Sequence, residues 1–196
     1  MGDFARYEAA LSKGHSYSWE QKWAAAVEAF EAALREFADK PAPYAGLGMA
    51  YFSLNQVDKA LHNYKLAAHY SRGDVIYLRQ VADMQERLGR GQEAGQTYMA
   101  IGEISLRQNE TDQAVENWQR AASLEPMLLG AHQRLAKYYT TQRQLPLAIQ
   151  EYLAIAHIYQ ANNENHKAYQ TLKAAVQLDP RNTEVLTCLL YTSPSP

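Results

Sequence analysis

The chain has 196 residues, of which 47% are hydrophobic and 20% charged, and its formal net charge at pH 7 is −2. Its 19 Lys and Arg residues are balanced by 21 Asp and Glu residues, so no field of one sign would attract a nucleic acid or an anionic membrane. A single cysteine, Cys188, excludes an intrachain disulfide framework and a Cys-rich zinc site. The first residues lack the regions of a signal peptide, and no apolar run is long enough for a transmembrane helix, so we expect a cytoplasmic protein.

Residues 7–40 predict two helices joined by a turn near residues 20–22. In the second helix, Ala26, Phe30 and Ala33 are spaced by four and three residues, which places all three on one helix face. Alanines at these offsets allow a neighbouring helix to approach closely, while the aromatic ring fills the gap between them. The pattern therefore predicts a helical hairpin.

Residues 41–74 carry the same pattern 34 residues later and add a distinctive first helix. The positions concerned are Tyr44, Leu47, Gly48 and Tyr51 in the first half, and Ala60, Tyr64 and Ala67 in the second. Repeats of this length with these two halves resemble the tetratricopeptide repeat family, and residues 7–40 resemble a degenerate copy. The resemblance implies an all-α, right-handed α-solenoid of antiparallel helical hairpins.

The second half of the chain departs from a plain 34-residue array. Two of the alanine spacings shrink to 20 residues, between Ala94 and Ala114 and between Ala148 and Ala168. One helix should therefore close one repeat and open the next. We expect two three-helix units of 54 residues, 75–128 and 129–182, related by duplication, because twelve of 33 aligned residues are identical between them.

Turn residues divide the chain into about ten helices, with another beginning near Thr183. Asp74 and Thr111 are candidate N-caps, and Pro146 suits a first helical turn, where its missing N–H costs nothing. No linker between the predicted helices is long enough to mark a domain boundary.

The last residues predict a change of character. Residues 188–196 end in Pro-Ser-Pro, which cannot continue a helix. This segment resembles adapter read-through at the end of a metagenomic reading frame. We therefore expect a single α-solenoid over residues 1–187, followed by a non-native or disordered tail. An uncapped last helix would leave an apolar end open to self-association.

No constellation of residues supports catalysis, so we predict a protein that is not an enzyme and that holds no cofactor and no metal. The six histidines lack the metalloprotease spacing, and the sequence contains neither a phosphate loop nor a nucleophile elbow. Asp83 and Glu86 are flanked by Arg79, Arg87 and Arg90, which favours a surface charge network over acid–base chemistry. The 14 tyrosines could form a base-stacking platform, but most occupy packing positions of the repeat, and we expect them in the core.

The tetratricopeptide resemblance also implies that the first helix of each hairpin lines a concave groove. The predicted groove residues are Met49, Phe52, Arg79, Asp83, Glu86, Gln133 and Lys137. An apolar patch at Met49 and Phe52 beside mixed charges would suit a peptide, although these positions also suit ordinary solvated residues. The family's clamp for C-terminal carboxylates uses Lys and Asn at fixed positions, which this sequence does not match.

We therefore predict a non-catalytic scaffold that binds a protein or peptide in the groove. One alternative is a regulatory region that controls a catalytic or DNA-binding domain of a larger protein. Another is an RNA-binding helical repeat, which the charge balance disfavours.

Overall fold

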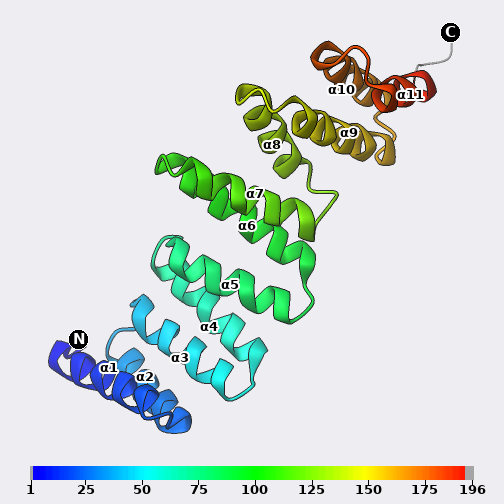
Figure 1. Ribbon diagram of the computed structural model, residues 1–196. Helices are drawn as coiled ribbons and strands as arrows, with labels where there is room; N and C mark the ends of the chain where they lie inside the picture. The colour runs from blue at the N-terminus through cyan, green and yellow to red at the C-terminus, as the bar shows by residue number, and fades with distance from the viewer. Residues whose placement is uncertain (1, 193–196) are drawn as a thin grey trace. The chain divides into compact units, whose positions relative to one another are not determined.

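The computed structural model describes residues 2–192, and this range contains eleven α-helices and no β-strand (Figure 1). The helices are α1 (Phe4–Trp19), α2 (Trp23–Glu36), α3 (Pro41–Ser53), α4 (Val57–Tyr70), α5 (Val75–Arg87), α6 (Gly91–Arg107), α7 (Thr111–Leu124), α8 (Leu129–Thr141), α9 (Leu145–Ala161), α10 (Asn165–Leu178) and α11 (Thr183–Thr192). The predicted all-α class is confirmed.

The helix lengths confirm the predicted three-helix period. Helices α5, α6 and α7 have 13, 17 and 14 residues, and α8, α9 and α10 repeat the same three lengths. By contact, the chain divides within α6 into two compact units, one up to Thr97 and one from Tyr98 onward.

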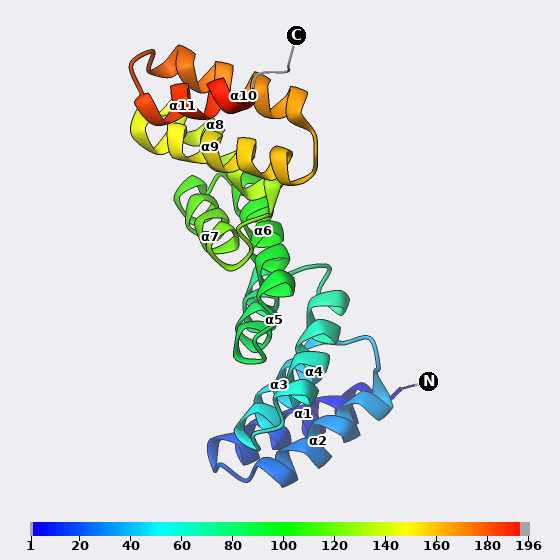
Figure 2. The same ribbon diagram turned by 90° about the vertical axis from the view of Figure 1, so that its right-hand side faces the viewer.

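In the first unit, α1 packs on α2, α3 on α4 and α4 on α5, while α3 also contacts α1 and α2 (Figures 1 and 2). One core cluster contains Phe30 and Leu47, and a second contains Tyr64, Val81 and Met84. The alanines that set the repeat, Ala26 and Ala60 among them, are fully buried. The 34-residue pattern therefore marks the core as expected.

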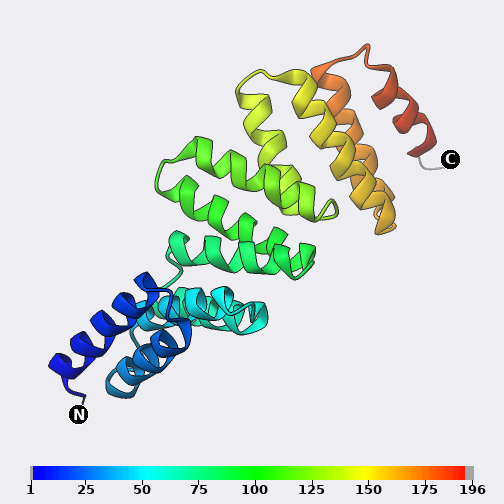
Figure 3. The same cartoon turned by 60° about the horizontal axis from the view of Figure 1, so that its bottom comes forward.

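In the second unit, each helix from α7 to α11 packs on the next one along the chain, and α9 and α10 run side by side (Figure 3). The cluster around Trp118 joins residues of α7, α8 and α9, and the cluster around Leu172 joins residues of α9, α10 and α11. The neighbouring residues Ala148 and Ile149 of α9 belong to these two different clusters. Helix α9 is therefore apolar on two sides, as a helix shared by two hairpins must be.

Close packing within the hairpins pairs a small residue with a large one sixteen positions later. A Cβ atom on the glycine would lie 2.5 Å from the ring for Gly14 and Phe30, 2.8 Å for Gly48 and Tyr64, and 2.5 Å for Gly102 and Trp118. At the same spacing, the α9–α10 hairpin has Ala156 and Leu172, which are 2% and 0% exposed. Where alanine replaces glycine at the first position of the pair, leucine replaces the aromatic residue at the second. The total volume of the pair therefore changes little, and the two helices stay closely packed.

The helix ends confirm two of the three expected end signals. The Asp74 carboxylate accepts a hydrogen bond from the Ile76 N–H at 2.8 Å and caps α5, and Pro146 lies in the first turn of α9. The prediction for Thr111 is wrong because the chain reverses at Asn109, where φ is +63°, so that Glu110 takes the N-cap position and Thr111 is already helical.

Six tight turns each contain one non-glycine residue with positive φ, between +57° and +63°. These residues are Gln21, Asn55, Arg72, Asn109, Arg143 and Asn163. This left-handed conformation lets backbone N–H groups after a helix bond back to its last carbonyls. The N–H of the residue that follows does so in each case, as from Gln144 to the Tyr139 carbonyl at 2.9 Å.

The helix that was expected to begin near Thr183 extends to Thr192, through the first five residues of the expected tail. The Thr192 hydroxyl accepts a hydrogen bond from the Gln160 side-chain amide at 2.7 Å, and Thr192 is buried. Residues 193–196 of that tail lie outside the described residues. That residues 188–196 are not native stays a prediction.

Candidate functional site

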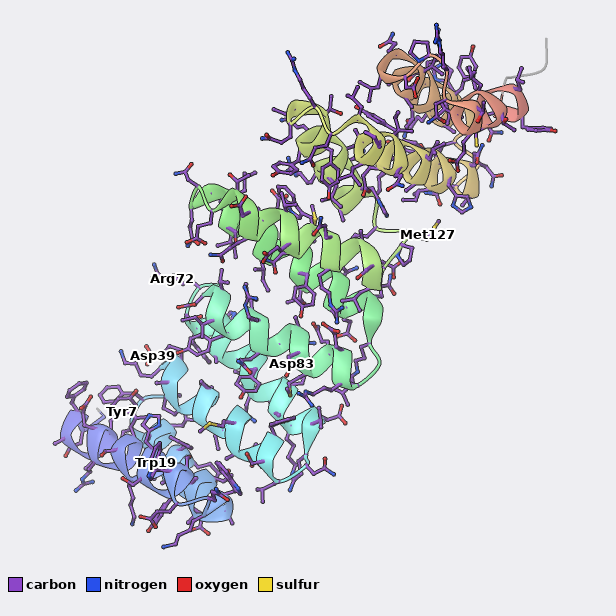
Figure 4. All side chains as sticks on the ribbon, in the orientation of Figure 1. Tyr7, Trp19, Asp39, Arg72, Asp83 and Met127 are labelled. Atoms are coloured by element: carbon purple, nitrogen blue, oxygen red, sulfur yellow. The ribbon has the colours of Figure 1, made fainter. Side chains whose placement is uncertain are left out.

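In the first unit, the predicted groove residues lie on α3 and α5. Met49 is 37% exposed, whereas Phe52 is half-buried beneath the guanidinium of Arg87, whose carbon lies 4.8 Å from the ring centroid. Arg87 Nε also donates to Asp83 Oδ2 at 3.1 Å. Asp83, labelled in Figure 4, therefore joins Arg87 and Phe52 in a contact that links the two helices.

The sequence predicted a charge network around Asp83 and Glu86, but only some of the expected residues form ion pairs with each other. Arg87 binds Asp83, but Arg90 binds Asp58 at 2.8 Å instead. Glu86 is half-buried, and Arg79 is exposed and has no ion pair within the described range. Arg79 is therefore a cation that the fold itself does not neutralise.

Helix α5 separates a buried side from an exposed one. Val81, Ala82 and Met84 are at most 4% exposed, while Ile76 is 68% exposed and Arg79 lies one turn further along the helix. Ile76 and Arg79 thus place an exposed apolar side chain beside a cation that has no ion pair within the described residues. Of this pair, Arg79 is a predicted groove residue, and Ile76 is an exposed apolar neighbour that the groove prediction did not include.

In the second unit, Gln133 and Lys137 lie one turn apart on α8, and both are exposed. Gln133 Nε2 donates to the Tyr159 hydroxyl at 3.4 Å. The Lys137 ammonium has no ion pair among residues 2–192. Lys137 also borders a cavity.

That cavity has a volume of about 270 Å³ and lies between α6, α7 and α8; we refer to it as the α6–α8 cavity. Its lining residues are Leu106, Thr111, Trp118, Arg134, Lys137, Tyr138, Thr141 and Gln142. Arg134 is bound by both carboxylate oxygens of Glu103, at 2.8 and 3.0 Å. Sequence reasoning missed the cavity because its walls come from three helices, and no residue spacing marks such a combination.

A buried histidine joins α8 to its neighbours. His132 is 8% exposed; its Nδ1 lies 2.6 Å from Glu151 Oε2 and its Nε2 lies 3.1 Å from the Pro126 carbonyl oxygen. A carboxylate and a carbonyl both accept hydrogen bonds, so only the protonated ring can donate to both. The hydrogen bond to Glu151 raises the pKa of His132 above its ordinary value, against the opposing effect of burial. No periodic signal in the sequence marks this contact.

Several of the tyrosines that were expected in the core are buried or packed against other rings. Tyr64 and Tyr139 are 7% and 5% exposed, and burial raises the pKa of Tyr64 to about 12. Tyr44 stacks on Tyr70 with ring centroids 5.3 Å apart, and its hydroxyl donates to the Ala38 carbonyl. These rings are therefore not available as a row of stacking platforms.

Within residues 2–192, no group of three or more His, Cys, Asp or Glu side chains is placed to hold a metal ion. Over the same range, every helix is too short or too polar to span a lipid bilayer. Cys188 is a half-buried free thiol on α11.

Comparison with known protein families identifies one segment of the chain. Residues 149–182 match the tetratricopeptide repeat family. The match begins inside α9 and covers α10, so α9 opens a repeat as well as pairing with α8. The resemblance of the sequence to this family is confirmed. No curated protein matches the chain at a significant level.

Solved structures with similar folds have low sequence identity to this chain. The hetero-tetramer Cut9–Hcn1 of the APC/C matches with a TM-score of 0.47 and 15% identity over 96% of this chain and 43% of that chain. Pseudomonas aeruginosa PilF matches with a TM-score of 0.44 and 15% identity over 95% of this chain and 98% of that one. YrrB, described as a TPR protein with an unusual peptide-binding site, matches with a TM-score of 0.42 and 12% identity over 91% of this chain and 89% of that one. The present chain thus spans less than half the length of the Cut9–Hcn1 chain that it matches.

Proposed function

We propose that this protein is a non-catalytic scaffold that binds a protein or peptide partner through the exposed faces of α3, α5 and α8. The observation that carries the proposal is the set of side chains that the fold leaves unused on α5 and α8. Ile76 on α5 is 68% exposed, and the exposed side chains of Arg79 on α5 and Lys137 on α8 have no ion pair within the described range. Apolar anchors beside unpaired charges are the features that protein interfaces use for affinity and for partner choice.

The match of residues 149–182 to a tetratricopeptide repeat supports an interaction role by analogy. The groove residues in the two units need not bind one continuous segment for this proposal to hold. Each unit presents its own unpaired cation, so each can contribute separately to binding.

A peptide selection tests the proposal and does not require the natural partner to be identified first. A phage-displayed library of random dodecapeptides is selected on the wild-type protein, and the selected peptides are measured by calorimetry. We expect the double variant Arg79→Glu, Lys137→Glu to bind at least about tenfold more weakly, a loss of about 1.4 kcal/mol. Its melting temperature should equal that of the wild type because both side chains are exposed.

The matched control is the double variant Lys173→Glu, Arg181→Glu, which makes the same change in net charge at exposed positions of α10 and the turn after it. This control should bind like the wild type. Wild-type affinity of the Arg79, Lys137 variant for every selected peptide would remove α5 and α8 from the binding surface.

We also propose that α11 mediates self-association. Leu190 and Tyr191 are 77% and 88% exposed, which leaves a large apolar surface on one side of this helix. Sedimentation velocity should show a concentration-dependent dimer that Leu190→Glu with Tyr191→Glu abolishes. If the wild-type protein sediments as a monomer over a 100-fold range of concentration that reaches about 1 mM, this contact is contradicted.

A further inference from the structure

The α6–α8 cavity is of a size and composition that suit one amino-acid side chain. Its volume of about 270 Å³ lies just below the range for small-molecule pockets, about 300–1,000 Å³. Most of the surface that lines it is apolar, and Leu106, Trp118 and Tyr138 are among the lining residues. An apolar side chain placed against this surface would be removed from water, which favours its binding.

The rim of the cavity carries one uncompensated positive charge. Two lining residues are cations and none is an acid. Arg134 is bound in a bidentate ion pair by Glu103, which neutralises it, whereas Lys137 has no ion pair within the described part of the chain. Two acids, Glu110 and Asp112, are sequence neighbours of the lining residue Thr111, but neither of them lines the cavity.

We propose that this cavity receives an apolar side chain of a partner peptide and that Lys137 pairs with the carboxylate of an adjacent Asp or Glu in that peptide. The apolar side chain would supply the affinity, and the carboxylate would supply the preference among peptides. A Lys or Arg in place of the acid would bring two like charges together at the rim and bind more weakly. The inference rests on the scaffold function proposed above and names the motif that one of its faces recognises.

Designed peptides test the motif directly. The probes are acetylated and amidated pentapeptides of sequence Gly-Gly-Leu-X-Gly, where X is Glu, Gln or Lys, with Gly-Gly-Gly-Glu-Gly as the peptide that lacks the anchor. Binding is followed by the ¹H–¹⁵N resonance of the Trp118 indole N–H, assigned by its loss in Trp118→Phe. Trp118 is 3% exposed and lines the cavity, so its signal reports occupation of this site.

We expect the Leu-Glu peptide to shift the Trp118 signal with a dissociation constant at least about fivefold lower than that of the Leu-Lys peptide. The Leu-Gln peptide should lie between them, and the peptide without leucine should cause no shift. Equal affinity for Leu-Glu and Leu-Lys would overturn the role of Lys137, and the absence of a shift with any peptide at about 10 mM would overturn the cavity as a binding site.

Charge variants make the assignment specific to one side chain. Lys137→Glu should reverse the order of the Glu and Lys peptides, and Lys137→Gln should abolish the difference between them. The control Lys173→Glu should leave the wild-type order unchanged because Lys173 lies on α10, away from the cavity lining. An unchanged preference in both Lys137 variants would overturn the pairing.

The outcome is separable from that of the scaffold proposal. If phage-selected peptides bind and depend on Arg79 and Lys137 while the leucine peptides cause no shift at Trp118, the cavity motif alone is wrong. If the leucine peptides bind as expected but no phage peptide depends on Arg79, the binding face of the first unit is wrong and the cavity motif stands.

Discussion

Replacing Gly102 with alanine should destabilise the second unit because the added methyl group has no space. The new Cβ atom would lie 2.5 Å from Trp118 Nε1, 2.6 Å from its Cδ1 and 3.1 Å from the Ala114 carbonyl oxygen. Trp118 is 3% exposed and packs with Leu135 and Tyr139, so a displacement of its ring disturbs these core contacts.

The distances set the size of the effect. Ordinary carbon contacts lie at about 3.5–4.0 Å, so the indole ring or the helix must move by about 1 Å. Overpacking of a well-filled core costs about 1–3 kcal/mol. The gain from replacing glycine by alanine inside a helix is about 0.5–1 kcal/mol. We therefore expect a net loss of about 1 kcal/mol in the free energy of unfolding, within a range of about 0–2.5 kcal/mol.

Gly130→Ala is the matched control in the same unit. Its Cβ atom would meet only the terminal methyl of Met99, at 3.3 Å, and a flexible methionine can give way. We therefore expect no loss of stability and a gain of up to about 1 kcal/mol, from the same replacement of glycine by alanine inside a helix. Urea denaturation followed by circular dichroism measures both variants.

A rescue experiment tests the size matching itself. The double variant Gly102→Ala, Trp118→Leu copies the pair Ala156 and Leu172 of the α9–α10 hairpin. Its free energy of unfolding should exceed the value expected from adding the two single changes by about 1 kcal/mol or more. The double variant Gly130→Ala, Trp118→Leu should show the additive value. If Gly102→Ala proves as stable as Gly130→Ala, or if the rescue is additive, the packing argument is wrong.

Three further predictions concern a buried histidine, a helix cap and a turn. Because the pKa of His132 is raised in the folded state, its contacts with Glu151 and Pro126 should stabilise the fold fully below the unfolded value of about 6.5 and lose this effect as pH rises through the folded pKa. Urea titrations across this pH range should therefore show a slope that His132→Gln removes, and an equal slope in both proteins would refute it. Asp74→Ala should lower the free energy of unfolding by about 1 kcal/mol through loss of the cap on α5, while Asp74→Asn should not; equal losses would argue against the cap. Arg143→Gly should raise that free energy by up to about 1 kcal/mol because φ at this turn is +57°, and a lower melting temperature would count against backbone strain there.

The core could be predicted from the sequence because its residues recur at fixed spacings. Ala26 and Ala60 lie 34 residues apart and are both fully buried, as are Ala114 and Ala148 in the second half. In a repeat, the same position occurs several times in the sequence. A small or apolar residue that recurs at that position in several copies therefore marks the core more reliably than a single occurrence does. Helix ends depend on single residues instead, which is why the position of Thr111 was misjudged by one residue.

The candidate site could be predicted only in part because its contacts cross between helices without a period. Lys137 is exposed on α8, and its place in a binding groove stays a prediction. The bidentate pair of Arg134 with Glu103 depends on the rotamers of two long side chains 31 residues apart. Arg87 covers Phe52 from a helix that the repeat pattern treats as a separate copy. Contacts of this kind follow from the packed structure and leave no trace in residue spacing.

The shared helix α9 has a mechanical consequence. In a plain array of hairpins, an end hairpin can detach under load and leave its neighbour intact. Here the adjacent residues Ala148 and Ile149 are buried in two successive cores, so α9 cannot leave one core and stay packed in the other. A pulling force that enters through α10 is therefore transmitted directly to α8, and this part of the chain resists extension as one block, where separate hairpins would yield one at a time.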